Sequence, residues 1–170
     1  AGRQRLSHVQ IDAAVGVLSS AEGTVVVQGD AGSGKTTMLR AVGGVAGAEG
    51  WEVVGAALQG VAAKNLEVES GIKSMTATGA GGAGERKGRH RLVVVDEAGM
   101  LGSRQTAELQ EAAARRGDKV VLVGDRYQLL SIGAGAPFER LVETAEASGR
   151  LIRLHENYRQ KNPDLKAAVD

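Results

Sequence analysis

The sequence predicts an α/β domain in which a mostly parallel central sheet lies between two layers of helices. Short β-branched runs alternate along the chain with segments whose apolar residues have helical spacing, and this order is typical of parallel βαβ units. One run, at 92–95, is continuously apolar, as expected of a strand buried on both faces. A chain of 170 residues with 42% hydrophobic residues suits a single domain over 1–170.

The chain opens with a predicted helix over 6–18. Ser7 suits its N-cap, and four apolar residues at helical spacing predict its buried face: Ile11, Ala14, Val15 and Leu18. The next helix starts near Thr36 and ends near Gly47 or Gly50, with a buried stripe of Met38, Leu39, Val42 and Val45. The other elements predicted in this half are strand 24–28, strand 52–58 and helix 60–68.

The pattern weakens between 70 and 91. Residues 78–84 are glycine-rich and of low complexity, and 85–91 is a basic cluster, so we expect a flexible loop over 79–91. The basic cluster is either a solvated rim or an edge that contacts phosphates. Regular elements resume after it, in the order strand 92–95, helix 103–116 with Gly117 as its stop, strand 120–123, helix 137–147, strand 151–154 and a helix from Pro163.

Composition excludes several classes of protein. The formal net charge is +1, so any contact with nucleic acid depends on a local patch. There is no cysteine, which excludes a disulfide framework or a thiolate metal site. With no signal pattern and no apolar run long enough to span a bilayer, we expect a cytoplasmic protein without membrane contact. The chain starts at Ala1 instead of Met, and we expect an excised domain.

A glycine-rich stretch follows the first predicted strand. Residues 29–36 fit G-x-x-x-x-G-K-[ST] between a strand and a helix, the setting in which this motif cradles a triphosphate. Lys35 is predicted to reach the β- and γ-phosphates, and the Thr36 hydroxyl to bind Mg²⁺. The predicted nucleotide-binding residues here are Gly29, Ala31, Gly32, Ser33, Gly34, Lys35, Thr36 and Thr37. The fold is therefore predicted to be a P-loop NTPase.

A pair of carboxylates ends the strand at 92–95. We expect Asp96 to hold Mg²⁺ and Glu97 to orient and deprotonate the attacking water, so the pair indicates hydrolysis. The alternative is a pair of carboxylates that only complements a helix dipole. Asp96–Gly99 also fits the D-x-x-G of GTPases, but the chain contains no N-K-x-D guanine reader. A small-molecule kinase is disfavoured because no arginine-rich lid is present and Glu97 indicates water as the acceptor.

The ordered set of motifs resembles the first motor domain of superfamily 1 DNA helicases of the RecD-like branch. Within it, the chain is most similar to the helicase region of conjugative relaxase–helicases of the TraA and TraI type. The segments that carry the resemblance are 55–58, 62–66, 69–72, 95–100, 102–105 and 132–138. The resemblance implies a RecA-like fold of about five strands, with the strand that ends at Asp125 between the strands that end at the phosphate loop and at Asp96.

The resemblance also implies roles for further residues. Gln10 is similar to the glutamine that reads adenine, Gln128 to the motif III glutamine at the γ-phosphate, and Arg159 to the motif IV arginine that stabilises transition-state charge. The catalytic set is therefore Lys35, Glu97, Gln128 and Arg159. The implied contacts with single-stranded DNA are Gly60, Ala62, Ala63, Lys64 and Thr76.

Two departures from the family pattern limit this expectation. The segment from Thr76 to Leu92 is short and glycine-rich, which argues against a strand-separating pin, and no second RecA-like domain follows. We expect one half of an ATP- and Mg²⁺-dependent DNA helicase motor whose partner is that second domain. The rivals are a nucleotide-binding module without turnover and a P-loop ATPase that acts on RNA or protein.

Overall fold

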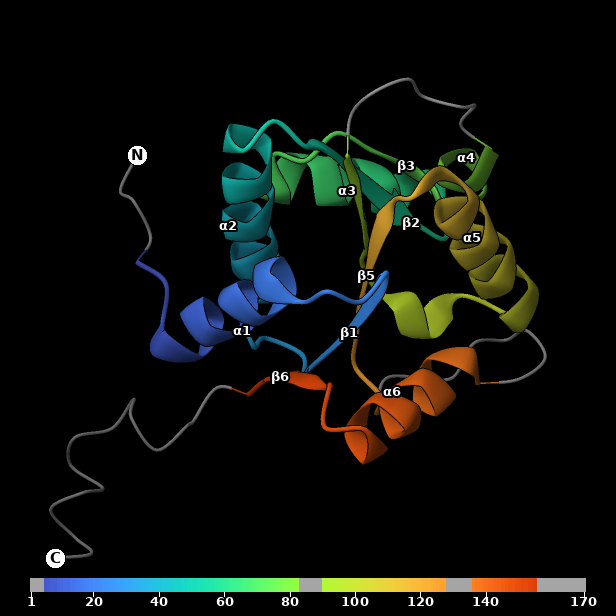
Figure 1. Ribbon diagram of the computed structural model, residues 1–170. Coiled ribbons are helices and arrows are strands. Elements are labelled where there is room, and N and C mark those ends of the chain that lie inside the picture. The colour runs from blue at the N-terminus through green and yellow to red at the C-terminus, as the bar shows by residue number, and fades with distance from the viewer. Residues whose placement is uncertain (1–4, 83–89, 128–135, 156–170) are drawn as a thin grey trace, which may run out of the picture.

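A computed structural model describes residues 5–82, 90–127 and 136–155. Within them a six-stranded sheet has the order β3-β2-β4-β5-β1-β6, and every neighbouring pair is parallel (Figure 1). The strands are β1 Thr24–Gly29, β2 Glu52–Ala57, β3 Ser74–Thr76, β4 Arg91–Val95, β5 Lys119–Gly124 and β6 Ile152–Leu154. The α-helices are α1 His8–Ser19, α2 Lys35–Ala48, α3 Gly60–Ser70, α4 Ala77–Gly82, α5 Ser103–Arg116 and α6 Pro137–Ala147, with a 3₁₀ turn η1 at Ala98–Met100.

Two hydrophobic clusters fill the spaces above and below the sheet. Val25 and Val27 of β1 point into the cluster formed with α1 and α2, whereas Val26 points into the cluster formed with α4, α5 and α6. Alternate residues of a strand face opposite sides of a sheet, so one strand serves both cores. The predicted three-layer architecture is confirmed, and Figure 1 shows α1 and α2 on one side of the sheet and α5 and α6 on the other.

The position of β5 brings the two predicted chemical motifs together. This strand pairs with β1 through Val26↔Leu122 and with β4 through Val95↔Leu122, so it lies between them as expected. The carboxyl ends of β1, β4 and β5 therefore meet at one edge of the sheet, where ligands of open α/β sheets bind. Among the described residues, no helix is both long and apolar enough to cross a membrane.

The segment after Ser70 is more regular than expected. It forms β3 and the short helix α4, so the expectation of a flexible loop over 79–91 is wrong for 79–82. It is also wrong for Arg91, which is buried and begins β4, and the sheet has six strands instead of about five. Ala77 and Ala80 are buried in the cluster with α5, which explains how a helix of small residues is held in place. Residues 83–89 and the helix expected from Pro163 lie outside the described part of the chain.

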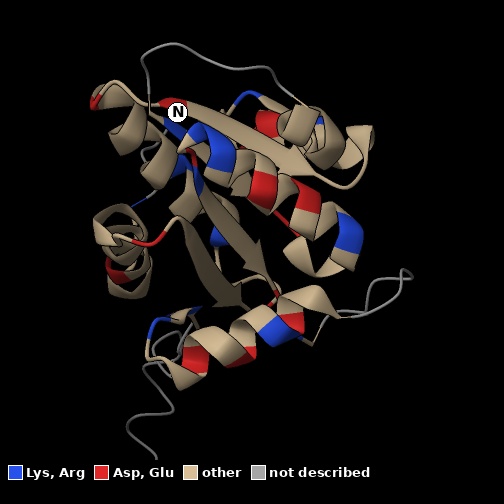
Figure 2. Ribbon diagram, turned by 45° about the vertical axis from the view of Figure 1, so that its right-hand side comes forward, with Lys and Arg blue, Asp and Glu red and all other residues tan. Residues whose placement is uncertain are grey.

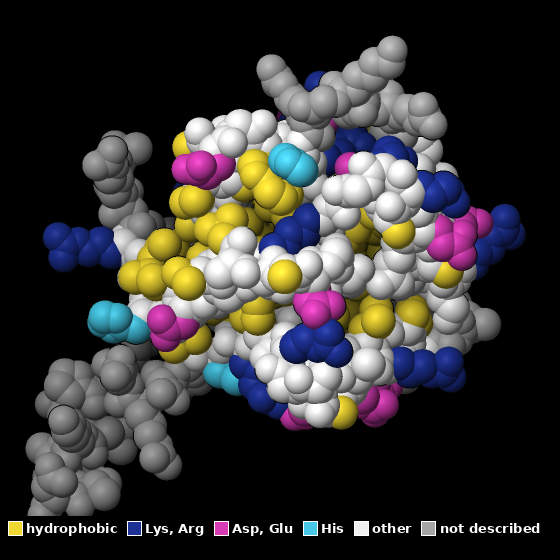
Figure 3. Space-filling model, in the orientation of Figure 1, with side chains coloured by type: hydrophobic (Ala, Val, Ile, Leu, Met, Phe, Trp, Pro, Cys, Tyr) yellow, Lys and Arg dark blue, Asp and Glu magenta, His cyan; other side chains and the backbone are white. Residues whose placement is uncertain are grey.

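Helix α1 buries a different face from the predicted one. Ile11 and Val15 are 42% and 57% exposed, whereas Gln10, Ala13, Ala14 and Val17 are buried. The helix is turned so that Gly16 packs on β6, where an added Cβ would lie 3.0 Å from Cδ1 of Ile152. Val45 of α2 is likewise 50% exposed, and Figure 3 shows apolar side chains gathered on the side of the molecule formed by α1 and α2.

Candidate nucleotide-binding site

The phosphate loop joins β1 to α2 through residues 30–34. Gly34 is the N-cap of α2 and has a left-handed backbone with φ +81°, and Gly32 has φ +74°, conformations that glycine adopts without strain. No side chain caps the first turn of α2, so its backbone N–H groups are directed at the loop. A helix N-terminus with uncapped donors attracts an anion such as a phosphate.

Lys35 lies at the start of α2 and folds back over the loop. Its Nζ donates to the carbonyl oxygens of Gly29 at 2.9 Å and Asp30 at 2.8 Å. Thr36 and Thr37 follow in the first turn and are half-buried. The hydroxyl of Ser33 is buried and makes no hydrogen bond, and a buried polar atom of this kind normally has a partner. The loop thus presents an ammonium, the first amides of α2 without a side-chain cap, and an unsatisfied hydroxyl, a donor set that fits a polyphosphate.

Three side chains from other elements hold this loop. Nε2 of Gln10 donates to the Gly34 carbonyl at 3.2 Å, Oδ2 of Asp125 accepts from the Ala31 amide at 3.2 Å, and Nδ1 of His155 lies 3.1 Å from Oδ2 of Asp30. Sequence reasoning selected Gln10 but not Asp125 or His155. Both follow directly on strands, β5 and β6, and that position at the carboxyl edge was the signal available in the sequence.

Asp96 and Glu97 follow β4 on the other side of β5. Oδ1 of Asp96 accepts from the Glu97 amide at 2.9 Å, and the Asp96 amide donates to the Ala56 carbonyl at 3.2 Å. Burial raises the pKa of Asp96 above its usual range, partly offset by the bond from the Glu97 amide and by the charge of Lys35. Because β5 pairs with both β1 and β4, the phosphate loop and the Asp96–Glu97 turn lie at the same edge of the sheet.

Glu97 has a backbone conformation that side chains rarely adopt. Its φ of +51° is the only positive value among the described non-glycine residues, and its side chain is exposed. A left-handed residue other than glycine costs about 1–2 kcal/mol, and such strain is concentrated at functional sites. The turn directs the carboxylate outward from the strand end instead of into the core. An exposed carboxylate at this position is accessible to a water molecule.

The residues predicted to bind Mg²⁺ are compatible with that ion. Thr36 and Asp96 would offer oxygen atoms at the loop and at the end of β4, and Mg²⁺ is usually held by one or two protein ligands together with phosphates and waters. No group of three or more His, Cys, Asp or Glu among the residues described could hold a metal. The hydroxyl of Thr36 and the carboxylate of Asp96 are therefore the donors that fit Mg²⁺ held partly by the phosphates of a nucleotide.

The predicted DNA contacts lie at the other end of the carboxyl edge. Ala57 of β2 is in register with Thr76 of β3, which brings the start of α3 next to Thr76. Gln59, the N-cap of α3, makes no side-chain capping bond, so the amides of Gly60 and Ala62 lack a side-chain cap, and Lys64 is exposed one turn further on.

Two of these predicted contacts have structural roles as well. Ala63 is only 3% exposed and its amide donates to the carbonyl of Gln59 at 2.9 Å. The Thr76 hydroxyl oxygen accepts from the Gly79 amide at 3.2 Å and so supports the first turn of α4. Gln128 and Arg159 lie outside the described residues, and their assigned roles stay predictions.

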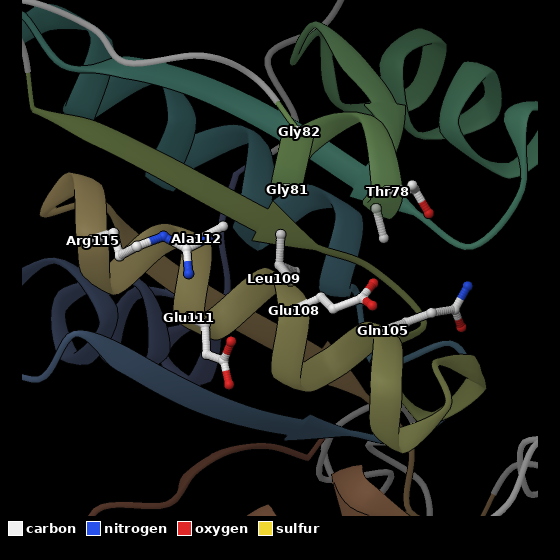
Figure 4. A pocket seen from close by; sticks show the side chains of 10 residues that line it. Thr78, Gly81, Gly82, Gln105, Glu108, Leu109, Glu111, Ala112 and Arg115 are labelled. Carbon is white, nitrogen blue, oxygen red and sulfur yellow. The ribbon is translucent and has the colours of Figure 1, made fainter.

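A separate cleft of about 270 Å³ lies between α4 and α5 (Figure 4). Its lining mixes acidic and basic side chains with small residues, among them Thr78, Glu108, Glu111 and Arg115. None of the residues of the phosphate loop or of the Asp96–Glu97 turn lines it. The chemistry predicted from the sequence is therefore not located there but on the strand ends.

Known proteins of similar sequence indicate the family to which this chain belongs. The "AAA domain" family model matches residues 5–170. The "Probable conjugal transfer protein TraA" of Sinorhizobium fredii is 44% identical over 144 residues, 82% of this chain and 13% of that protein. The "ATP-dependent RecD2 DNA helicase" of Deinococcus radiodurans is 36% identical over 154 residues, 85% of this chain and 21% of that protein.

The solved structures include one of the same fold, the Pif1 helicase from Candida albicans. It superposes with a TM-score of 0.65 at 24% identity over 94% of this chain and 42% of that one. The chain spans only 13% to 21% of the length of the two relatives named above. The chain belongs to the AAA domain family, as a RecA-like P-loop domain of the superfamily 1, RecD-like helicase type.

Proposed function

We propose that this domain binds and hydrolyses ATP with Mg²⁺ and that the cycle drives movement along single-stranded DNA. In this proposal it is the N-terminal motor lobe of a DNA helicase, in a conjugative transfer protein of the cytoplasm. The observation that carries the proposal is that two motifs flank the end of β5: Lys35 and Thr36 follow β1 on one side, and Asp96 and Glu97 follow β4 on the other. Phosphate binding and water activation are then available at one strand edge.

Each residue has a defined part in hydrolysis. The amides of the phosphate loop and the ammonium of Lys35 neutralise the phosphates, which orients the γ-phosphate toward the end of β4. Mg²⁺, when bound, supplies further charge neutralisation, and Thr36 and Asp96 are the side chains that would hold it. Glu97 accepts the proton of the attacking water, and its exposed carboxylate lies on the solvent side of the turn. Gln128 and Arg159 are proposed to contact the γ-phosphate.

The DNA side of the proposal depends on α3. Its uncapped amides at Gly60 and Ala62 and the charge of Lys64 suit phosphates of a single strand. Figure 2 marks acidic and basic residues interspersed along the helices in the view shown, and the formal net charge of the chain is only +1. A short track at the carboxyl edge, shared with a second RecA-like domain of the same longer protein, is therefore the form of DNA contact we propose. Closure of the two lobes on ATP would convert hydrolysis into movement.

The test is the ATPase rate of the full-length protein with and without single-stranded DNA. We expect strong stimulation by DNA and little stimulation by RNA of the same sequence. ATP binding without turnover would favour a nucleotide-binding module, and turnover that DNA does not stimulate would favour an ATPase that acts on RNA or protein. Either result would overturn the proposal.

A further inference from the structure

The carboxylate of Asp125 connects two parts of the site that are far apart in the sequence. This residue follows β5 and is only 8% exposed. Its Oδ1 accepts from the amide of Tyr127 at 2.9 Å, and its Oδ2 accepts from the amide of Ala31 at 3.2 Å. Burying a carboxylate is costly unless its oxygens accept hydrogen bonds, and here each oxygen accepts one. Asp125 therefore joins the turn after β5 to the phosphate loop.

The backbone around Asp125 is tightly packed. A Cβ on Gly124 would lie 2.9 Å from Cε1 of Phe138 and 3.2 Å from the amide nitrogen of Gly99. A Cβ on Gly99 would in turn lie 3.6 Å from the carbonyl oxygen of Asp125. The end of β5 is thus pressed against the turn that begins at Glu97. Asp125 lies where the phosphate loop, the Glu97 turn and the turn after β5 meet.

A purely local role explains only half of this arrangement. An aspartate that accepts from the amide two residues on forms an Asx-turn, a common way to shape a loop. The bond to Tyr127 is of this kind, but the bond to Ala31 spans 94 positions of the chain and shapes no local turn. A carboxylate would also repel phosphate oxygens, so contact with the nucleotide is not its use. The role that remains for the Asp125 carboxylate is to hold the phosphate loop in position.

We infer that Asp125 is a positioning residue that fixes the phosphate loop to the end of β5 in the shape that receives a nucleotide. The inference rests on the proposed function, since the loop is taken to bind ATP. The turn that Asp125 caps leads directly into Gln128. One carboxylate thereby ties the phosphate loop to the turn at Tyr127, the residue that precedes Gln128 in the sequence.

Asp125→Ser in the full-length protein separates the two bonds. A serine hydroxyl can still accept from Tyr127 in the turn, but it is too short to reach Ala31. We expect the Kd for ADP and the KM for ATP to rise about tenfold, the loss expected for one hydrogen bond to a charged group, while kcat at saturating ATP changes less than KM.

The melting temperature of Asp125→Ser without nucleotide should fall no further than that of Asp118→Ser. Asp118 is the matched control, since its carboxylate is 6% exposed, pairs with Arg116 and lies before β5, far from the loop.

The outcomes separate a positioning role from a structural one. Equal ADP affinity in Asp125→Ser and wild type, or an equal loss in Asp118→Ser, would overturn the inference. If the serine variant does not fold, Asp125→Asn is the second test, because it keeps the shape and offers one oxygen to two donors. It should show a smaller rise in the Kd for ADP, and no rise would overturn the inference. ADP binding is measured without DNA. If DNA did not stimulate the wild-type ATPase, the proposed movement along DNA would be refuted, but the role of Asp125 in ADP binding could still be tested.

Discussion

The side-chain nitrogen of Gln10 donates to the carbonyl oxygen of Gly34 at 3.2 Å and thereby links α1 to the phosphate loop. Oε1 of the same side chain accepts from the Ser7 amide at 2.8 Å, and the Gln10 amide donates to the Ser7 hydroxyl oxygen at 3.2 Å. One buried glutamine thus completes the capping box of α1 and holds the glycine that starts α2. Because an amide nitrogen carries two hydrogens, Gln10 can keep this bond and still donate to a base.

Gln10→Glu tests the link between the helix and the loop. The carboxylate keeps the acceptor for Ser7 but places a negative oxygen against the Gly34 carbonyl, so we expect the affinity for ATP to fall by about tenfold with a smaller loss of stability. Gln105→Glu is the matched control, since Gln105 accepts from the Gly102 amide at the start of α5 and lines the cleft between α4 and α5 instead of the loop. Titration of both variants with ATP and GTP measures the effect. Equal affinities in the two variants would show that the link is unimportant, and a loss confined to ATP would support adenine reading.

Gly34→Ala is expected to abolish nucleotide binding and to destabilise the fold by about 1–3 kcal/mol. The backbone of Gly34 has φ +81°, and an added Cβ would overlap the side-chain nitrogen Nε2 of Gln10. Gly44→Ala is the control, because nothing lies within 4 Å of a Cβ there and the residue is inside α2. That change should stabilise the protein by up to about 1 kcal/mol. Thermal unfolding and nucleotide titration of both variants check the contrast, and a Gly34→Ala protein that binds ATP normally would contradict it.

The parts of the site that could be predicted are those that depend on residues close together in the sequence. The loop 29–36 and the pair Asp96–Glu97 each follow an apolar strand. Because the carboxyl ends of parallel strands lie at the same edge of a sheet, both motifs were expected at that edge. The boundaries of α5 were predictable for the same reason: the apolar spacing and the stop at Gly117 both lie within one helix.

The parts that could not be predicted depend on contacts between distant residues. Gln10 is buried and Ile11 exposed because α1 is rotated to bring a polar side chain to the loop, against the ordinary preference for apolar burial. Helix α4 consists of residues with little helix signal, and its order comes from packing on α5. The bond between Asp125 and Ala31 joins residues 94 positions apart, and the sequence showed only that Asp125 follows a strand, not what it contacts.

Lys35→Ala is expected to remove nucleotide binding or turnover. In the structure its ammonium is held by the carbonyl oxygens of Gly29 and Asp30, which places it over the loop that would carry the phosphates. Loss of that charge leaves the phosphates opposed only by backbone amides. The measurement is ATP titration and steady-state ATPase activity of the full-length protein. Parental activity in Lys35→Ala would mean that the loop is not the ATP site.

Glu97 allows the chemical and the conformational roles to be separated. Glu97→Gln removes the base and keeps the shape, so ATP should stay bound while hydrolysis stops. Glu97→Asn also removes the base, but asparagine tolerates the left-handed φ of +51°, so the variant should be more stable by up to about 1 kcal/mol. Single-turnover hydrolysis and thermal unfolding measure the two effects. Hydrolysis by Glu97→Gln at the parental rate would show that another group is the base.

Lys64 tests the proposed DNA edge independently of the nucleotide. It is exposed on α3, one turn after the uncapped amides, so Lys64→Ala should weaken binding to single-stranded DNA of every sequence and reduce the slope of log K against log salt by about 0.7. Affinity for ATP should be unchanged, because the phosphate loop follows β1, with β4 and β5 between β1 and β2. Lys73→Ala is the control, since this exposed lysine precedes β3 and so lies at the amino edge of the sheet. Identical salt slopes for Lys64→Ala, Lys73→Ala and wild type would place the DNA elsewhere.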